Sequence, residues 1–95
     1  MNQRADEWMR LEGPLNMETV PAWFATGTQR LANEDLLVDF SRVEAVDSAA
    51  IGMLLGWARA AQGAGRELQV TGMPEALLSL SRLYGVDVML PQQSA

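Results

Sequence analysis

The sequence predicts an α/β or α+β fold in which helices pack on a small mixed β-sheet. A strand pattern, a helix pattern and a second strand pattern follow one another within about 35 residues, which is typical of a βαβ unit with a right-handed crossover. Further helix patterns precede and follow this unit. The 95 residues, of which 48% are hydrophobic and 20% charged, suit one soluble globular domain with a single core.

The N-terminal part of the domain is predicted to contain a strand and a helix. Residues 8–15 alternate loosely between apolar and polar and break at Gly13-Pro14, so we predict an edge strand there. Over residues 19–31 the apolar side chains recur at helical spacing, and Pro21 suits the first turn of a helix.

The central βαβ unit follows. Residues 36–40 are an almost unbroken apolar run, which suits a strand that is covered on both faces. Residues 48–63 have the pattern of a second helix, and residues 67–71 alternate like a third strand.

A last helix is predicted to begin near Pro74 and to stop at Gly85, because proline is favoured in the first turn and glycine just beyond the last one. Residues 86–90 are predicted to form a final short strand. We therefore expect a single domain over residues 8–91, with frayed ends at residues 1–7 and 92–95.

Composition excludes several classes of function. The chain has no His and no Cys, so it lacks an imidazole base, a thiolate nucleophile and the ligands of an N/S metal site, although a carboxylate-only site remains open. Its net charge of −5 and scattered basic residues argue against nucleic-acid binding. No apolar run approaches the roughly 20 residues of a membrane span, and no signal-peptide core is present, so we expect a cytoplasmic protein.

The second predicted helix has two apolar sides. At 100° per residue, five side chains gather within about 60° of one direction and form the expected core stripe, namely Ile51, Leu54, Leu55, Ala58 and Gln62. The opposite side holds Ala49, Met53, Gly56, Trp57 and Ala60. Another element of the chain could cover this opposite side, or it could be a docking surface.

We predict the docking surface, because small residues let a partner backbone approach closely while methionine and tryptophan are favoured in interfaces. Trp23 is added to it, since one of two adjacent aromatic residues on a helix must point away from the other. The predicted partner-binding residues are Ser48, Ala49, Met53, Gly56, Trp57, Ala60 and Trp23.

Asp47 and Ser48 stand at the start of the same helix. Either side chain is a good N-cap, because its oxygen can accept from the first free backbone amides. Ser48 is also a candidate phosphorylation site, since a phosphate there would meet free N–H groups and the positive end of the helix dipole.

Residues 36–73, LLVDFSRVEAVDSAAIGMLLGWARAAQGAGRELQVTGM, closely resemble the STAS family of sulfate-transporter and anti-sigma-factor-antagonist domains. The shared pattern is a strand ending in Asp, a polar loop, Asp-Ser or Asp-Thr, an apolar helix and a second strand. The resemblance implies a STAS-like α/β fold with a mixed central sheet of four or five strands and about three main helices along one side.

Two branches of that family fit the sequence. Anti-sigma factor antagonists usually carry Asp-Ser-Ser-Gly at this helix start, and a partner kinase phosphorylates the serine that Ser48 matches. Here Ala49-Ala50 replaces the Ser-Gly pair that follows it. The other branch is the small STAS subunit of the Mla-type ABC transporter, which moves phospholipid between the membranes of Gram-negative bacteria. It is similar in length, in Trp23 and in the ending SLSRLYGVDVMLPQQ.

We favour the transporter branch. It implies a non-catalytic subunit without cofactor or metal that docks on the transporter ATPase, and through it on the permease, with Ser48 at that interface. It further implies a cytoplasmic protein that is peripheral to the inner membrane and supports lipid asymmetry of the outer membrane.

Overall fold

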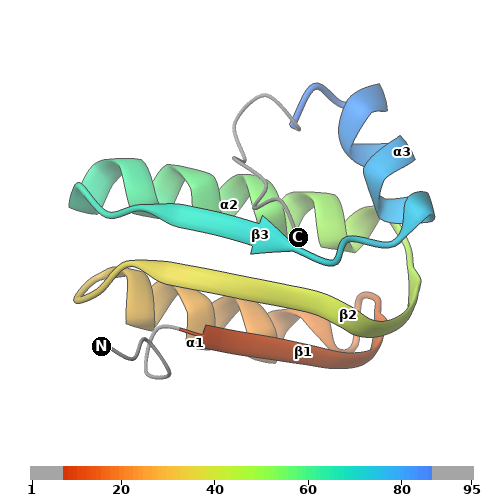
Figure 1. Cartoon of the computed structure of the whole chain (residues 1–95), viewed down its shortest axis with the longest axis horizontal. Coiled ribbons are helices and arrows are strands. Elements are labelled where there is room, and N and C mark those ends of the chain that lie inside the picture. The colour runs from red at the N-terminus through yellow and green to blue at the C-terminus, as the bar shows by residue number, and fades with distance from the viewer. Residues whose placement is uncertain (1–7, 87–95) are drawn as a thin grey trace.

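Strands and helices alternate along the part of the chain, residues 8–86, that the computed structural model describes (Figure 1). The elements are β1 (Trp8–Leu15), α1 (Val20–Leu31), β2 (Leu36–Val46), α2 (Ser48–Ala64), β3 (Leu68–Thr71) and α3 (Glu75–Leu83). All six were predicted from the sequence, and the α/β class is confirmed. The predicted strand at residues 86–90 lies, apart from Val86, outside the described residues.

The three strands form one sheet in the order β1-β2-β3, and both pairs are parallel. Within residues 8–86 the sheet is thus entirely parallel, where a mixed sheet was predicted. Strand β2 is central, which explains its apolar first half, and it continues to Val46, six residues beyond the predicted end. The register aligns Arg10 of β1 with Asp39 of β2, and Asp39 with Thr71 of β3.

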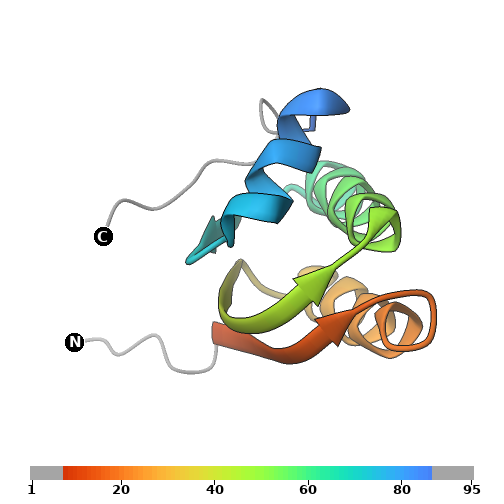
Figure 2. The same ribbon diagram turned by 90° about the vertical axis from the view of Figure 1, so that its right-hand side faces the viewer.

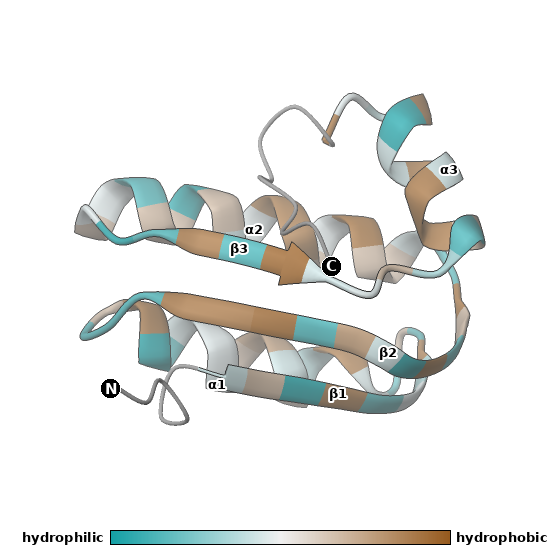
Figure 3. Cartoon of the chain, viewed as in Figure 1, coloured by the Kyte–Doolittle hydropathy of each residue, from teal (hydrophilic) through white to brown (hydrophobic). Residues whose placement is uncertain are grey.

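Helices α1 and α2 lie on the same face of the sheet, while α3 lies beyond the end of β3 (Figures 1 and 2). The core fills the space between this helical layer and the sheet, and Figure 3 shows the hydrophobic first half of β2 in front of it. Alternate residues of each strand face the helices and are buried: Met9, Leu11, Leu15, Leu36, Val38, Phe40, Leu68 and Val70.

The second apolar side of α2 is covered by α1. Trp57 is fully buried and its indole N–H donates to the carbonyl oxygen of Phe24 in α1 at 3.1 Å. A Cβ atom on Gly27 would clash with the Trp57 indole, and one on Gly56 would clash with the Phe24 ring. The two glycines therefore let α1 and α2 approach closely. The predicted docking surface around Met53 and Trp57 is wrong, because both side chains are buried inside the domain.

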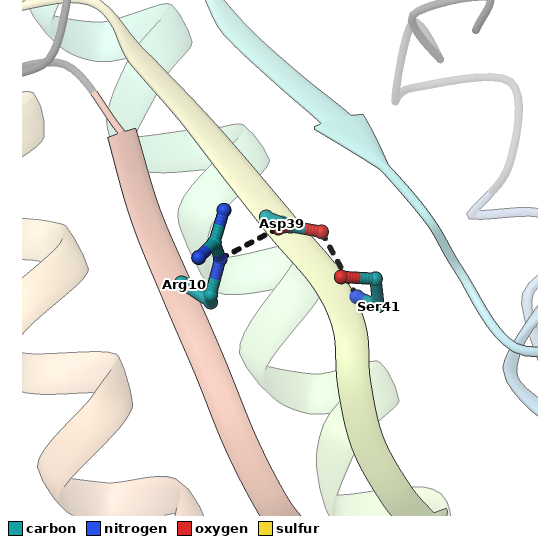
Figure 4. A network of polar contacts seen from close by, with 3 residues as sticks. All are labelled: Arg10, Asp39 and Ser41. Atoms are coloured by element: carbon teal, nitrogen blue, oxygen red, sulfur yellow. Dashed lines mark hydrogen bonds and ion pairs between the residues drawn. The ribbon is translucent and has the colours of Figure 1, made fainter.

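A buried carboxylate lies on the sheet face opposite the helices (Figure 4). The Asp39 side chain is only 9% exposed, and it pairs with the Arg10 guanidinium across the strands at 2.9 Å. Its second oxygen accepts from the backbone N–H of Ser41 at 2.9 Å. Burial raises the pKa of Asp39, but the hydrogen bonds from Ser41 and the charge of Arg10 outweigh that effect, so the pKa lies below its usual 3.8.

Asp39→Asn should lower the free energy of unfolding by about 1–3 kcal/mol at pH 7, since the Arg10 guanidinium loses its buried partner. A carboxyl group whose pKa is depressed by folding stabilises the fold above its unfolded pKa, and this stabilisation is lost as the pH falls through the folded value. The difference between the variant and the wild type should therefore shrink below about pH 4. Urea denaturation at pH 7 and pH 3 measures it.

Glu44→Gln is the control, because Glu44 is exposed and forms no ion pair among residues 8–86. It should change stability by less than about 0.5 kcal/mol at pH 7. A deficit of Asp39→Asn that is equally large at both pH values would show that the charge of Asp39 does not stabilise the fold.

Candidate functional site

The start of α2 is the part of the predicted site that the structure leaves open. Asp47 is the N-cap: its backbone is extended and its Oδ1 accepts from the N–H of Ala49 at 2.8 Å. Ser48 is the first helical residue and is exposed. Its hydroxyl has no hydrogen-bond partner within residues 8–86, so the prediction that Ser48 shares the capping role is wrong. The hydroxyl is available to another molecule.

The turn between β1 and α1 lies beside this helix start. The backbone N–H of Asp47 donates to the carbonyl oxygen of Leu15 at 3.2 Å, which joins the two segments. Figure 2 looks at the end of the molecule where they meet. Two residues after Leu15, the side chain of Met17 is 79% exposed.

Hydrogen bonds within this turn fix its shape. The Oδ1 atom of Asn16 accepts from the backbone N–H of Glu18 at 2.8 Å and from that of Thr19 at 3.0 Å. The Thr19 hydroxyl in turn donates to the carbonyl oxygen of Pro14 at 2.8 Å. Such side-chain-to-backbone bonds are typical of Asx turns, and they stabilise this turn, in which Met17 is exposed.

The remaining predicted site residues are distributed between core and surface. Four are partly buried: Ala49, Gly56, Ala60 and Trp23. Of these, Trp23 and Ala60 pack against the core, and Gly56 packs against Phe24 of α1. Met53 and Trp57 are buried, so Ser48 is the single predicted partner-binding residue that is exposed.

The exposed side of α2 runs through other residues than the predicted ones. Gly52, one turn after Ser48, is exposed and a Cβ atom there would meet nothing within 4 Å. Leu55 is half-buried, although it was predicted for the core stripe, and Gln62 is exposed. We call the exposed residues Ser48 and Gly52 of α2, together with Met17 of the neighbouring turn, the α2 entry surface.

A shallow, charged hollow lies on the sheet. It is lined by Glu12, Gly13, Arg42 and Glu44, from the second halves of β1 and β2. No group of three or more Asp, Glu, His or Cys residues that could hold a metal occurs in residues 8–86. The arrangement offers a hydroxyl, a thioether, an open glycine and peripheral charges, which suit contact with a protein partner.

Comparison with known proteins identifies the family. The sequence model of one protein family, described as "Mlab, STAS domain", matches residues 2–91. The chain belongs to this STAS domain family. A search of curated protein sequences finds no match.

Solved structures with the same fold include two anti-sigma factor antagonists. The STAS domain described here superposes on unphosphorylated SpoIIAA with a TM-score of 0.75 and 17% identity, covering 92% of this chain and 78% of that one. It superposes on a putative anti-sigma factor antagonist from Thermotoga maritima with a TM-score of 0.79 and 17% identity, covering 95% and 81% of the two chains. At this identity the likeness shows the STAS fold alone, which confirms the fold predicted from the sequence.

The helices of the STAS domain are short. Among residues 8–86, none has the length and apolar character that crossing a bilayer would need.

Proposed function

We propose that this STAS domain is a non-catalytic subunit of an Mla-type phospholipid ABC transporter. It docks through the α2 entry surface on the transporter ATPase, and through the ATPase on the permease, and it supports their assembly and activity. In this role it is cytoplasmic, lies peripheral to the inner membrane and contributes to the lipid asymmetry of the outer membrane.

The observation that carries the proposal is the exposed start of α2 in a chain whose family is described as "Mlab, STAS domain". The Ser48 hydroxyl has no partner among the described residues, and open space beside Gly52 lets another backbone approach the helix. The buried side of α2 is already used by α1, so docking at the helix start does not compete with folding.

Ser48→Glu tests the proposed interface. A carboxylate in the first turn suits the helix dipole, so the free domain should stay folded and melt within a few degrees of the wild type. In a complex, the new carboxylate must be desolvated beside Asp47, so we expect affinity for the Mla-type ATPase of the same organism to fall at least about tenfold, or ~1.4 kcal/mol. Calorimetric titration of the purified proteins measures it.

Thr26→Glu is the matched control, because Thr26 is an exposed hydroxyl residue in the middle of α1 and not part of the α2 entry surface. It should leave the affinity unchanged. If Ser48→Glu binds the ATPase as tightly as the wild type, the N-terminal end of α2 is not part of the interface. If the wild type forms no complex with the ATPase, the transporter proposal fails.

A second candidate function is supported by the same residue. The neighbours in fold are described as anti-sigma factor antagonists, one of them in its unphosphorylated form. Ser48 is exposed in the first turn of α2, where a phosphate would meet the positive end of the helix dipole. A kinase could therefore reach it. Intact-mass spectra of the protein purified from its native host distinguish the two functions: a major species carrying one phosphate on Ser48 favours the antagonist.

A further inference from the structure

Met17 is the most exposed large hydrophobic side chain of the described residues, at 79%. Its exposure is part of an ordered structure, because Asn16 and Thr19 bind the backbone of the turn on both sides of it. Methionine is unbranched and polarisable, so it fits irregular apolar pockets well. Since these bonds already fix the backbone of the turn, binding of Met17 would order mainly its side chain.

The turn adjoins the start of α2 through the hydrogen bond from the N–H of Asp47 to the carbonyl oxygen of Leu15. The turn that carries Met17 and the start of α2 therefore lie at one end of the molecule (Figure 2). A partner that covers the start of α2 is therefore close to the turn that carries Met17.

The charges at this end are mostly negative. Four exposed carboxylates, Glu12, Glu18, Glu44 and Asp47, accompany one arginine, Arg42. None of the five side chains forms an ion pair within residues 8–86. Their sum, one positive minus four negative charges, is −3, against −5 for the whole chain. The hollow between β1 and β2 is lined by two of these carboxylates, Glu12 and Glu44, and by Arg42.

We propose that Met17 is the anchor by which this domain selects its partner, and that the partner surface is an apolar pocket edged by lysine or arginine. The partner is the transporter ATPase, so this inference rests on the function proposed above. Met17 inserts into the pocket, while Glu18, Glu44 and Asp47 meet the basic edge. Complementary charge accelerates association of the two proteins and disfavours acidic partner surfaces. The buried apolar anchor slows dissociation of the complex.

Charge argues against two other occupants. A second copy of this chain that docks with the same surface would bring carboxylates against carboxylates, which is repulsive. An anionic lipid surface would be repelled in the same way. A basic protein surface is the occupant that the charges favour.

The test measures affinity for the purified Mla-type ATPase of the same organism. Met17→Asp should weaken binding at least tenfold, because a carboxylate would enter an apolar pocket, whereas Met17→Leu should stay within about threefold of the wild type because it keeps the apolar volume. Leu83→Asp is the matched control, since Leu83 is 75% exposed near the end of α3. All three variants should melt close to the wild type.

Salt provides the second readout. The affinity of the wild type should fall as sodium chloride rises from 50 to 300 mM, and the variant Glu18→Gln/Glu44→Gln should bind more weakly and depend less on salt. Full affinity of Met17→Asp, or an equal loss with Leu83→Asp, would overturn the anchor. Stronger binding by Glu18→Gln/Glu44→Gln would overturn the basic edge. In each of these cases Ser48→Glu can still lose binding, which keeps the proposed function separate, whereas a wild type that does not bind the ATPase removes both.

Discussion

Trp57→Ala is expected to lower the free energy of unfolding by about 3–5 kcal/mol, as truncation of a large buried aromatic side chain usually does. Trp57 is fully buried between α1 and α2, and its indole N–H satisfies the carbonyl oxygen of Phe24. Removing it leaves a cavity between the two helices and deletes this hydrogen bond. Denaturation with guanidinium chloride, followed by circular dichroism, measures the loss.

Two further variants serve as references for a large and a small loss of stability. Leu54→Ala should cost about 2–5 kcal/mol, because Leu54 is fully buried on the sheet side of α2. Trp8→Ala should cost far less, because Trp8 is 40% exposed at the start of an edge strand. A Trp57→Ala variant as stable as Trp8→Ala would mean that α1 does not close over Trp57 in solution and that this side of α2 is open to a partner.

The positions of the elements could be predicted from sequence because each has a clear local signal. The alternation in β1, the helical spacing with Pro21 in α1 and the turn residues around α3 depend only on neighbouring residues. The length of β2 was underestimated, because its second half, residues 41–46, has the sequence SRVEAV, which is mostly exposed and neither alternates nor continues the apolar run. Pairing with β1 extends it, as Leu15 lies opposite Val46.

The candidate site was harder to predict, because a helical pattern does not state what covers each side. The sequence correctly indicates that α2 is apolar on two sides, but α2 packs on the sheet and on α1 at once. The evidence that α1 covers the second apolar side of α2 comes from two contacts between residues distant in sequence, Gly27 with Trp57 and Phe24 with Gly56. Complementarity of this kind appears only when the two helices are placed together.

Ser48 and Met17 show the same contrast. Ser48 was predicted because a local motif, an Asp-Ser pair before an apolar helix, marks a helix start. Met17 carries no such local signal, because it lies 30 residues before Asp47 in the sequence. The backbone hydrogen bond between Asp47 and Leu15 brings its turn to the start of α2. Sequence spacing does not reveal this neighbourhood, whereas the parallel pairing of β1 with β2 produces it.

Four glycines in the two long helices provide the sharpest test of the packing. Gly27→Ala and Gly56→Ala should each lower the free energy of unfolding by about 1–3 kcal/mol, because the new methyl group collides with the Trp57 indole or the Phe24 ring. At Gly52 and Gly63 a methyl group would meet nothing within 4 Å, so the same change should raise stability by about 0.5–1 kcal/mol through helix propensity alone.

Because all four changes are chemically identical, their opposite signs isolate the contact between α1 and α2. A double-mutant cycle completes the test: in a Trp57→Leu background the indole is absent, so Gly27→Ala should become neutral or stabilising. The coupling free energy between positions 27 and 57 should then exceed about 1 kcal/mol, while Gly52→Ala should have the same effect in both backgrounds. Equal effects of Gly27→Ala and Gly52→Ala would place the indole elsewhere, and α2 would again have an uncovered apolar side.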